Sequence, residues 1–490
     1  MKLRSPTASS LPLIFGITLG LLFGAARSAL AFPPPLSIVP GTQSAHDNTL
    51  VIVRRSDRDA RDASGQLTRL TTAEHLRRAN VYMTNRAFEE AREHWQALIK
   101  YYPQDSAVPE ALLGIGRSYF QSRNYAEAYE TFDQLARRYS STKEGREGLN
   151  FSGSALVRLG RPADAVNRYI EYINRFPDGE RIDTAHLNVI DGLREAGKSQ
   201  EAIAWVRRTS QRFAGTPTEL NALFARLRLE VAEGNWKQAV SVADDLNKRS
   251  FQKGVLTTTA EVAYLRAYSL EQGGKRDEAI GAYLSIPDGL NAYYGWLASE
   301  RLLALANDRT RTLVSQRVDR VNAQILGAED LYPAPYRQTI VRTAKTRKID
   351  PRFVLAIIRQ ESVFRPLAKS PAGARGLLQL TIDAAQKYAS SAGLNTLRES
   401  ELYRPETSIL VGSEYLAHLV TLFPRMLEPV AASYNGGEDN VARWVQRAKQ
   451  KDPGVFTAEI GFDETKAYVQ KVMANYRAYR QLYTADLERR

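Results

Sequence analysis

The sequence has 490 residues, no cysteine and only five histidines. Without thiols the chain can form no disulfide, no thiolate nucleophile and no cysteine-based zinc site. The histidines are scattered along the chain, which disfavours both a histidine metal site and a Ser-His-Asp triad. The sequence therefore implies neither a metal nor an organic cofactor.

Long apolar runs are also absent beyond the N-terminus. The first residues combine Lys2 and Arg4 with an apolar stretch over residues 11–26 and a small-residue pattern that ends at Ala31. This order is typical of a secretory signal. We expect residues 1–31 to be a signal peptide cleaved after Ala31, with a retained membrane anchor as the alternative. The mature chain is then exported, with no further membrane span.

Charge is unevenly distributed. Lys and Arg number 67 against 54 Asp and Glu, and residues 331–490 hold 24 basic and 16 acidic side chains, an excess of 8. A basic C-terminal third suits an acidic polymer or an anionic surface. Nucleic acid is a poor candidate partner, because the chain is exported and lacks a basic-aromatic binding motif.

A repeat follows a Pro-rich and then charged segment, residues 32–70, for which we predict a flexible tether without a core. Alanine recurs every 37 residues and once more after 40, at Ala91, Ala128, Ala165, Ala202, Ala239 and Ala279. A bulky residue usually follows four positions later, as at Trp95, and glycine recurs at the same period at Gly160, Gly197 and Gly234. This pattern predicts stacked helix pairs resembling tetratricopeptide repeats.

The boundaries follow from where the pattern stops. We predict an all-α chain, with a helical-repeat superhelix over residues 71–290, a connecting helical segment over 291–331 and a mainly α domain over 332–490. The aromatic residues of the repeats either pack between helices, the favoured interpretation, or line a binding groove.

One carboxylate stands out in the last segment. Asp350-Pro351 is a favourable helix start, and the apolar stripe of Phe353, Val354, Ile357 and Ile358 leads to Glu361 one turn later. Burial and the negative end of the helix both raise the pKa of such a carboxyl, as a general acid requires. The alternative is a structural ion pair of Glu361 with Arg359, Arg365 or Arg375.

A Gly-rich stretch over residues 370–379 comes next, and here the residues carry a resemblance. Glu361-Ser362, Ser370, Gly373-Ala374, Gly376-Leu377 and Gln379 resemble the first motif of the soluble lytic transglycosylase catalytic domain. Residues 405–409, 432–437 and 462–469 resemble its later motifs in the same order. The repeats resemble the N-terminal superhelix of the larger family members.

The resemblance implies a lysozyme-like domain that cleaves the MurNAc–GlcNAc bond of peptidoglycan without water, forming 1,6-anhydromuramyl ends. Glu361 would act as acid and then as base. Substrate contacts would come from Ser370, Gln379, Tyr434, Asn435, Glu464 and Tyr468. Tyr434 would hydrogen-bond near the acid, and Tyr468 would pack beneath it. The expected location is the periplasm, and the expected partners are glycan strands, with possible envelope proteins on the repeats.

Alternatives stay open at this point. The same fold could carry a hydrolytic muramidase, or the chain could be a non-catalytic glycan-binding scaffold. Tyr434 and Asn435 could simply end a helix capped by glycine. Glu464 could be a surface partner of Lys466. Arg375 would weaken the acid if its charge reached Glu361, and would change little if it pointed to solvent.

Overall fold

The structure, a computed structural model, describes residues 45–490. The predicted signal peptide lies outside these residues. Within them the regular elements are α-helices and two short 3₁₀ helices, joined by turns and a few isolated bridges, so the predicted all-α class is confirmed. No helix among residues 45–490 combines the length and the apolar character needed to cross a bilayer.

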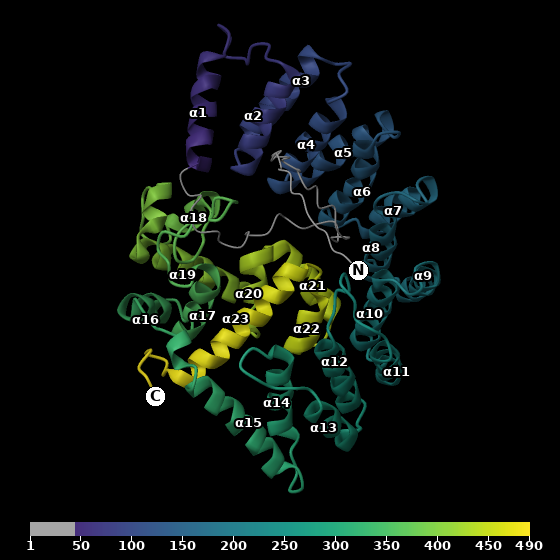
Figure 1. Cartoon of the computed structure of the whole chain (residues 1–490), viewed down its shortest axis with the longest axis vertical. Coiled ribbons are helices and arrows are strands. Elements are labelled where there is room, and N and C mark those ends of the chain that lie inside the picture. Colours follow the sequence, from purple (N-terminus) through teal and green to yellow (C-terminus); the bar gives the residue numbers. More distant parts are fainter. Residues whose placement is uncertain (1–44) are drawn as a thin grey trace, which may run out of the picture.

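Helix pairs fill the first half of the chain. They are α2 (Thr72–Thr84), α3 (Phe88–Tyr101), α4 (Val108–Gln121), α5 (Tyr125–Arg138), α6 (Lys143–Arg158), α7 (Pro162–Arg175), α8 (Ile182–Glu195), α9 (Ser199–Arg212), α10 (Pro217–Ala232), α11 (Trp236–Asn247), α12 (Thr259–Gln272) and α13 (Arg276–Leu284). In Figure 1 they follow one another along an arc, from α2 and α3 at the top to α13 near the bottom.

The repeated alanines explain how these pairs stack. Each of the six is fully buried and lies three residues after the start of the second helix of its pair. The bulky residue one turn later packs against a neighbouring helix, and a methyl group added at Gly153 of α6 would lie 2.6 Å from the ring of Tyr169 of α7. The aromatic residues at these positions, such as Trp95 and Phe132, are therefore packing residues, as favoured from the sequence.

The turn inside each pair shows a second periodicity. Gly160, Gly197 and Gly234 all have positive φ, between 71° and 74°. The same position in the first two pairs holds Arg86 and Arg123, with φ of 61° and 65°. Glycine adopts this left-handed conformation without steric cost, whereas arginine does so at a disadvantage.

These two arginines reach the C-terminal domain. Arg86 pairs with Asp383 at 3.0 Å, and Arg123 lies 3.2 Å from both Glu438 and Asp439. The start of the arc is thereby joined to the C-terminal domain, 297 and 315 residues away along the chain for the two hydrogen-bonded pairs.

The rest of the chain lies against the concave side of the arc (Figure 1). The connecting elements are α14 (Tyr293–Leu305), α15 (Arg311–Leu326) and η1 (Glu329–Leu331). The C-terminal domain contains α16 (Arg337–Thr346), α17 (Pro351–Ser362), α18 (Ile382–Ala389), η2 (Glu399–Tyr403), α19 (Pro405–Leu422), α20 (Leu427–Gly436), α21 (Glu438–Ala448), α22 (Pro453–Glu459) and α23 (Asp463–Leu482).

A buried ion cluster fixes this domain against the repeats. Glu459 of α22 is 1% exposed and pairs with Arg194 of α8, with Arg228 of α10 at 3.2 Å and with Arg447 of α21 at 3.4 Å. Removing one member would leave the remaining charges buried without compensation. The mutual position of the two parts is therefore specific.

The described part of the predicted tether, residues 45–70, differs from expectation. It begins with helix α1 (Ala45–Asp59), and both Val53 and Leu67 are buried. The carboxylate of Asp57 is buried as well and accepts hydrogen bonds from Arg78 and Tyr82. The prediction of a segment without a core is thus wrong here. The charged sequence contains apolar residues that are buried and an acid, Asp57, that is buried with hydrogen-bond partners.

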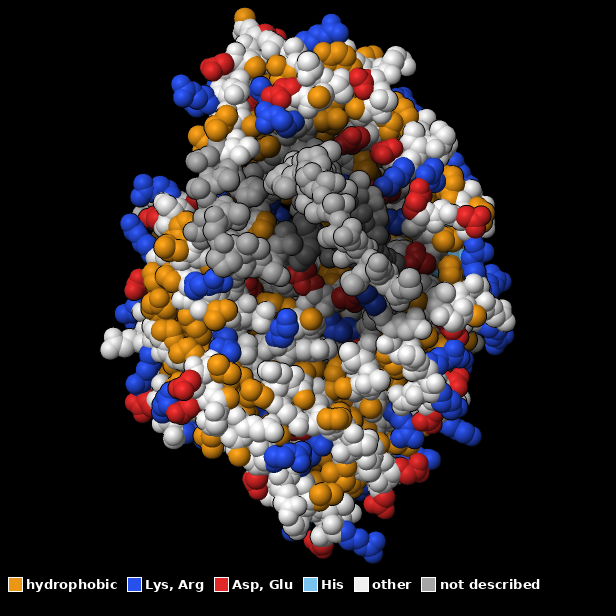
Figure 2. All heavy atoms as spheres, viewed as in Figure 1, with side chains coloured by type: hydrophobic (Ala, Val, Ile, Leu, Met, Phe, Trp, Pro, Cys, Tyr) orange, Lys and Arg blue, Asp and Glu red, His pale blue; other side chains and the backbone are white. Residues whose placement is uncertain are grey.

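Basic side chains are not confined to the C-terminal domain. Figure 2 shows Lys and Arg side chains over the repeats as well as over the C-terminal domain, with acidic side chains between them. The face seen there is of mixed sign.

Candidate active site

Glu361 lies where the helix pattern predicted, in the last turn of α17. The carboxylate of Asp350 caps the helix by accepting a hydrogen bond from the backbone N–H of Arg352. The stripe that precedes the acid, from Phe353 to Ile358, is fully buried. Glu361 itself remains partly accessible at the end of this stripe.

The environment of Glu361 suits a proton donor. Its Oε1 accepts a 2.6 Å hydrogen bond from the hydroxyl of Tyr468. Burial raises the pKa of the Glu361 carboxyl to about 7, and the nearby charge of Glu464 adds to the increase, while the bond from Tyr468 opposes it. Near neutral pH the carboxyl is therefore divided between its protonated and ionised forms.

Among residues 45–490, no ion pair joins Glu361 to Arg359, Arg365 or Arg375. Arg359 binds the side chain of Asn475 and a backbone carbonyl, and Arg365 donates to the carbonyl of Ser362. Arg375 donates to Glu399 at 2.8 Å and to a loop carbonyl. The open question about Arg375 is thus answered, because the charges that act on the Glu361 carboxyl do not include it.

The Gly-rich loop is held together by its own polar side chains. The hydroxyl of Ser370 accepts a hydrogen bond from the N–H of Ala374 at 3.1 Å. The side-chain amide of Gln379 donates to the carbonyls of Ala368 and Gly376, at 3.0 and 2.9 Å. Gly376 has φ of 78°, and a methyl group there would lie 2.0 Å from a backbone oxygen, so only glycine fits.

Helix α20 brings Tyr434 and Asn435 to this loop. The helix ends at Gly436 with Gly437 in a positive-φ conformation, so the interpretation as a glycine-capped helix end holds for the geometry. The hydroxyl of Tyr434 donates to the carbonyl of Leu378 at 2.6 Å, and the side chain of Asn435 accepts from Thr465 at 2.6 Å. These bonds tie α20 to the loop on one side and to α23 on the other.

The two tyrosines of the site bind different partners. Tyr468, expected to pack beneath the site, is buried and is the residue bonded to the acid. Burial, and after it the charge of Glu361, raises the pKa of Tyr434, whose hydroxyl is bonded to the loop. Lys466, the alternative partner of Glu464, instead forms a buried pair with Glu261 at 3.0 Å.

A cavity of about 240 Å³ opens beside Tyr434 and Asn435. Its other wall comes from the repeats and includes Arg86, Arg123 and Arg158. These arginines were not predicted from the sequence as part of the site region. The signal was nevertheless present, since stepping back by 37 residues from Gly160 leads to Arg123 and then to Arg86.

Comparison with known families supports both parts of the fold. Residues 338–456 match the family model described as Transglycosylase SLT domain. Residues 76–141 and 152–217 match the model described as Tetratricopeptide repeat. The resemblance stated from the motifs is thus confirmed for the two kinds of domain.

Curated relatives match in the C-terminal domain. The chain is 33% identical over 162 residues to the soluble lytic murein transglycosylase of Escherichia coli K12, covering 32% of this chain and 25% of that protein. It is 32% identical over 162 residues to the protein of the same name from Salmonella typhimurium, covering 33% and 25%. The matched segment thus spans about a quarter of the length of these relatives.

Among solved structures, the lytic transglycosylase Slt of Pseudomonas aeruginosa is similar over 89% of this chain and 85% of that chain, with a TM-score of 0.49 and 18% identity.

Proposed function

We propose that the chain is a peptidoglycan lytic transglycosylase that cleaves the MurNAc–GlcNAc β-1,4 bond with Glu361 as its catalytic residue. The observation that carries this proposal is the Glu361 carboxyl, hydrogen-bonded by Tyr468 and with its pKa raised by burial to about 7, inside a segment that matches the Transglycosylase SLT domain. A hydrogen-bonded acid with a pKa near 7 can both give and take a proton at neutral pH.

The proposed reaction uses both states of Glu361. Its protonated carboxyl donates to the glycosidic oxygen, and the bond from that oxygen to the muramyl C1 breaks. The resulting carboxylate then takes the proton of the C6 hydroxyl, whose oxygen bonds to C1 and closes the 1,6-anhydro ring. No water is consumed, and the acid returns to its starting state.

Other residues would position the sugar. We expect Gln379 to offer its side-chain oxygen to an acetamido N–H, because its amide nitrogen already binds the loop. Ser370 would contact the sugar from the same loop. Tyr434 would hold this loop in position through its hydrogen bond to the carbonyl of Leu378. Asn435 would hold the end of α20, while Glu464 would orient the sugar and keep the pKa of Glu361 high.

A hydrolytic muramidase is the competing reaction. A retaining hydrolase places a second carboxylate about 5–5.5 Å from the acid. Glu464 is a carboxylate whose charge acts on Glu361. The chemistry of the new chain ends distinguishes the two reactions.

The setting of the reaction is part of the proposal. The signal-like N-terminus and the name of the relatives, which refers to murein, together favour export to the periplasm. The outer surface of the repeats would then be available to envelope proteins.

The test is release of soluble fragments from purified sacculi. We expect the wild type to release them and Glu361→Gln to lose nearly all activity while keeping its fold. The matched control is Glu201→Gln on α9, which makes the same change at an exposed side chain and should keep full activity. Sacculi left intact by the wild type would contradict the proposed function.

A further inference from the structure

We propose that Glu261, a residue of the repeat helix α12, is a positioning residue for the reaction, because its ion pair with Lys466 holds the start of α23 in place beside Glu361. The proposal rests on the proposed function, since the helix that is held carries Glu464 and Tyr468. It assigns part of the arrangement of the active site to the helical repeats, through a residue that lies 205 positions before Lys466 in the chain.

The start of α23 presents different side chains to the acid and to the repeats. Glu464 and Tyr468 are four residues apart and therefore lie on one face of the helix. Lys466 is two residues from each of them, which turns it by about 200° to the opposite face. Tyr468 donates to Glu361 from the first face, and Lys466 pairs with Glu261 from the other. A shift of this turn would thus move both groups that act on the acid.

The ion pair between Lys466 and Glu261 is buried. The two side chains are 9% and 0% exposed, and their charged groups lie 3.0 Å apart. The carboxylate of Glu261 also accepts hydrogen bonds from Thr257 at 2.7 Å and from Tyr294 of α14 at 2.9 Å. A carboxylate with several donors is held in one position, so it offers Lys466 a fixed partner.

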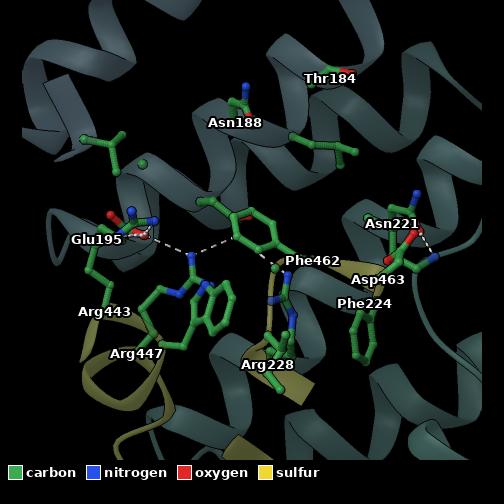
Figure 3. A pocket seen from close by; sticks show the side chains of 18 of the residues that line it. Thr184, Asn188, Glu195, Asn221, Phe224, Arg228, Arg443, Arg447, Phe462 and Asp463 are labelled. Carbon is green, nitrogen blue, oxygen red and sulfur yellow. Dashed lines mark hydrogen bonds and ion pairs between the residues drawn. The ribbon is translucent and has the colours of Figure 1, made fainter. Parts of the chain in front are cut away.

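The first turn of α23 meets the repeats at further points. The ammonium group of Lys466 donates to the backbone carbonyl of Leu256 at 3.2 Å and lies 5.0 Å from the ring centre of Phe224 of α10. Figure 3 shows Asp463, the first residue of α23, together with Asn221 and Phe224 of α10, and all three line a cavity of about 110 Å³. The turn is therefore in contact with α10 as well as with α12.

Apolar packing joins the same helices. One cluster of buried side chains includes Phe224 of α10, Leu265 of α12 and Val469 of α23. The buried residues of the first repeats, such as Trp95 of α3, belong to a separate cluster. The last repeats and the active-site helix thus form a single packing unit, in which a change on α12 can shift α23.

The first test removes the ion pair and measures cleavage of sacculi. Changing Glu261 alone would leave the buried Lys466 ammonium without a counter-ion and lower stability. The double variant Glu261→Gln/Lys466→Met removes both charges, a change that buried ion pairs often tolerate. We expect it to lower kcat about tenfold or more with KM nearly unchanged, because a misplaced acid weakens the transition state and not substrate binding. A double variant with the kcat of the wild type would overturn the proposal.

The matched control is Glu271→Gln on the same helix. Glu271 pairs with Arg301 of α14, outside the C-terminal domain, and accepts a hydrogen bond from Tyr283 at 2.8 Å. This change also removes an ion pair from α12, but it leaves the contact with α23 intact and should keep the kcat of the wild type. An equal loss of kcat in the control would mean that any weakening of α12 lowers activity, and the specific role of Glu261 would be refuted.

The second test does not depend on catalysis. In protein with ¹³C-labelled glutamate, NMR titration follows the Glu361 carboxyl, whose signal is identified by its absence in Glu361→Gln. Tyr468→Phe should raise the pKa of this carboxyl by roughly 1 pH unit in the wild type, and by less than about half of that in the double variant, where the hydroxyl has already moved away. A rise of the same size in both backgrounds would overturn the proposal. If the rise is reduced as expected but the wild type cleaves no sacculi, the proposed function fails and the positioning of α23 by Glu261 stands.

Discussion

The hydroxyl of Tyr468 donates a 2.6 Å hydrogen bond to Glu361, joining the second turn of α23 to the end of α17 across 107 residues of sequence. This bond fixes the carboxyl and stabilises its ionised form, while burial and Glu464 stabilise the neutral form. The pKa of about 7 is thus a balance of opposing effects that can be altered one at a time.

Removing the hydroxyl should shift this balance upward. In Tyr468→Phe the ionised acid loses a donor, so the pKa of Glu361 rises and activity persists to higher pH, by roughly 1 unit. The maximum kcat should fall because the carboxyl is no longer held. The pH dependence of kcat/KM checks this, with Tyr434→Phe as the control, since that hydroxyl binds Leu378. A shift to lower pH would refute the assignment.

Neutralising Glu464 should have the opposite effect. Its charge raises the pKa of the Glu361 carboxyl, so Glu464→Gln should lower that pKa and move the alkaline loss of activity to lower pH. The same pH series measures it. If Tyr468→Phe and Glu464→Gln moved the alkaline loss of activity in the same direction, the proposal that Tyr468 and Glu464 shift the pKa of Glu361 in opposite directions would be incorrect.

The ionised Glu361 carboxyl should also lower the free energy of unfolding at high pH. Folding raises the pKa of Glu361 from 4.5 to about 7, so the folded state binds the proton more tightly than the unfolded chain. Stability is then lost as pH rises through this window. Glu361→Gln should be more stable than the wild type by about 1–3 kcal/mol at pH values well above 7. Below about pH 4 the difference should vanish, because both states are then protonated. Urea unfolding at both pH values tests this, and a variant no more stable at high pH would contradict it.

Repeat packing predicts a contrast between two glycines. Gly153→Ala places a methyl group against the ring of Tyr169 and should lower the free energy of unfolding by about 1–3 kcal/mol. Gly281→Ala on α13 meets nothing within 4 Å and should be neutral or stabilising. Chemical denaturation of both variants measures the difference, and similar values for the two would argue against close stacking.

The contact between the start of the arc and the C-terminal domain should depend on Arg86 and Arg123. Replacing Arg86 and Arg123 together by glycine relieves the backbone strain of two arginines in the left-handed conformation. It also removes the ion pairs to α18 and α21. Exposed pairs of this kind contribute at most about 1 kcal/mol each. We expect nearly unchanged stability with a larger radius of gyration in X-ray scattering. An unchanged radius would mean that the buried cluster around Glu459 fixes the two parts without them.

Local patterns predicted much of this structure. The alanine period located the second helix of every pair, including α13, where the spacing widens to 40 residues because α11 and α12 are joined by a longer loop. The cap at Asp350 and the stripe before Glu361 located the acid. Each of these signals lies within one helix, where side-chain spacing determines which residues share a face.

Contacts between distant segments were less predictable. The pairing of Asp57 with Arg78 and the bond from Tyr468 to Glu361 both depend on how helices meet in space. Motifs placed Tyr434 and Tyr468 near the acid, but only the geometry determined which hydroxyl is bonded to it.

The most direct test of the central claim is mass spectrometry of the fragments that the wild type releases from sacculi in isotopically labelled water. The account predicts 1,6-anhydromuramyl ends, lighter than reducing ends by one water and free of label, and no fragments with Glu361→Gln. Labelled reducing ends would instead identify a hydrolase, and undiminished release by Glu361→Gln would show that Glu361 is not the catalytic acid.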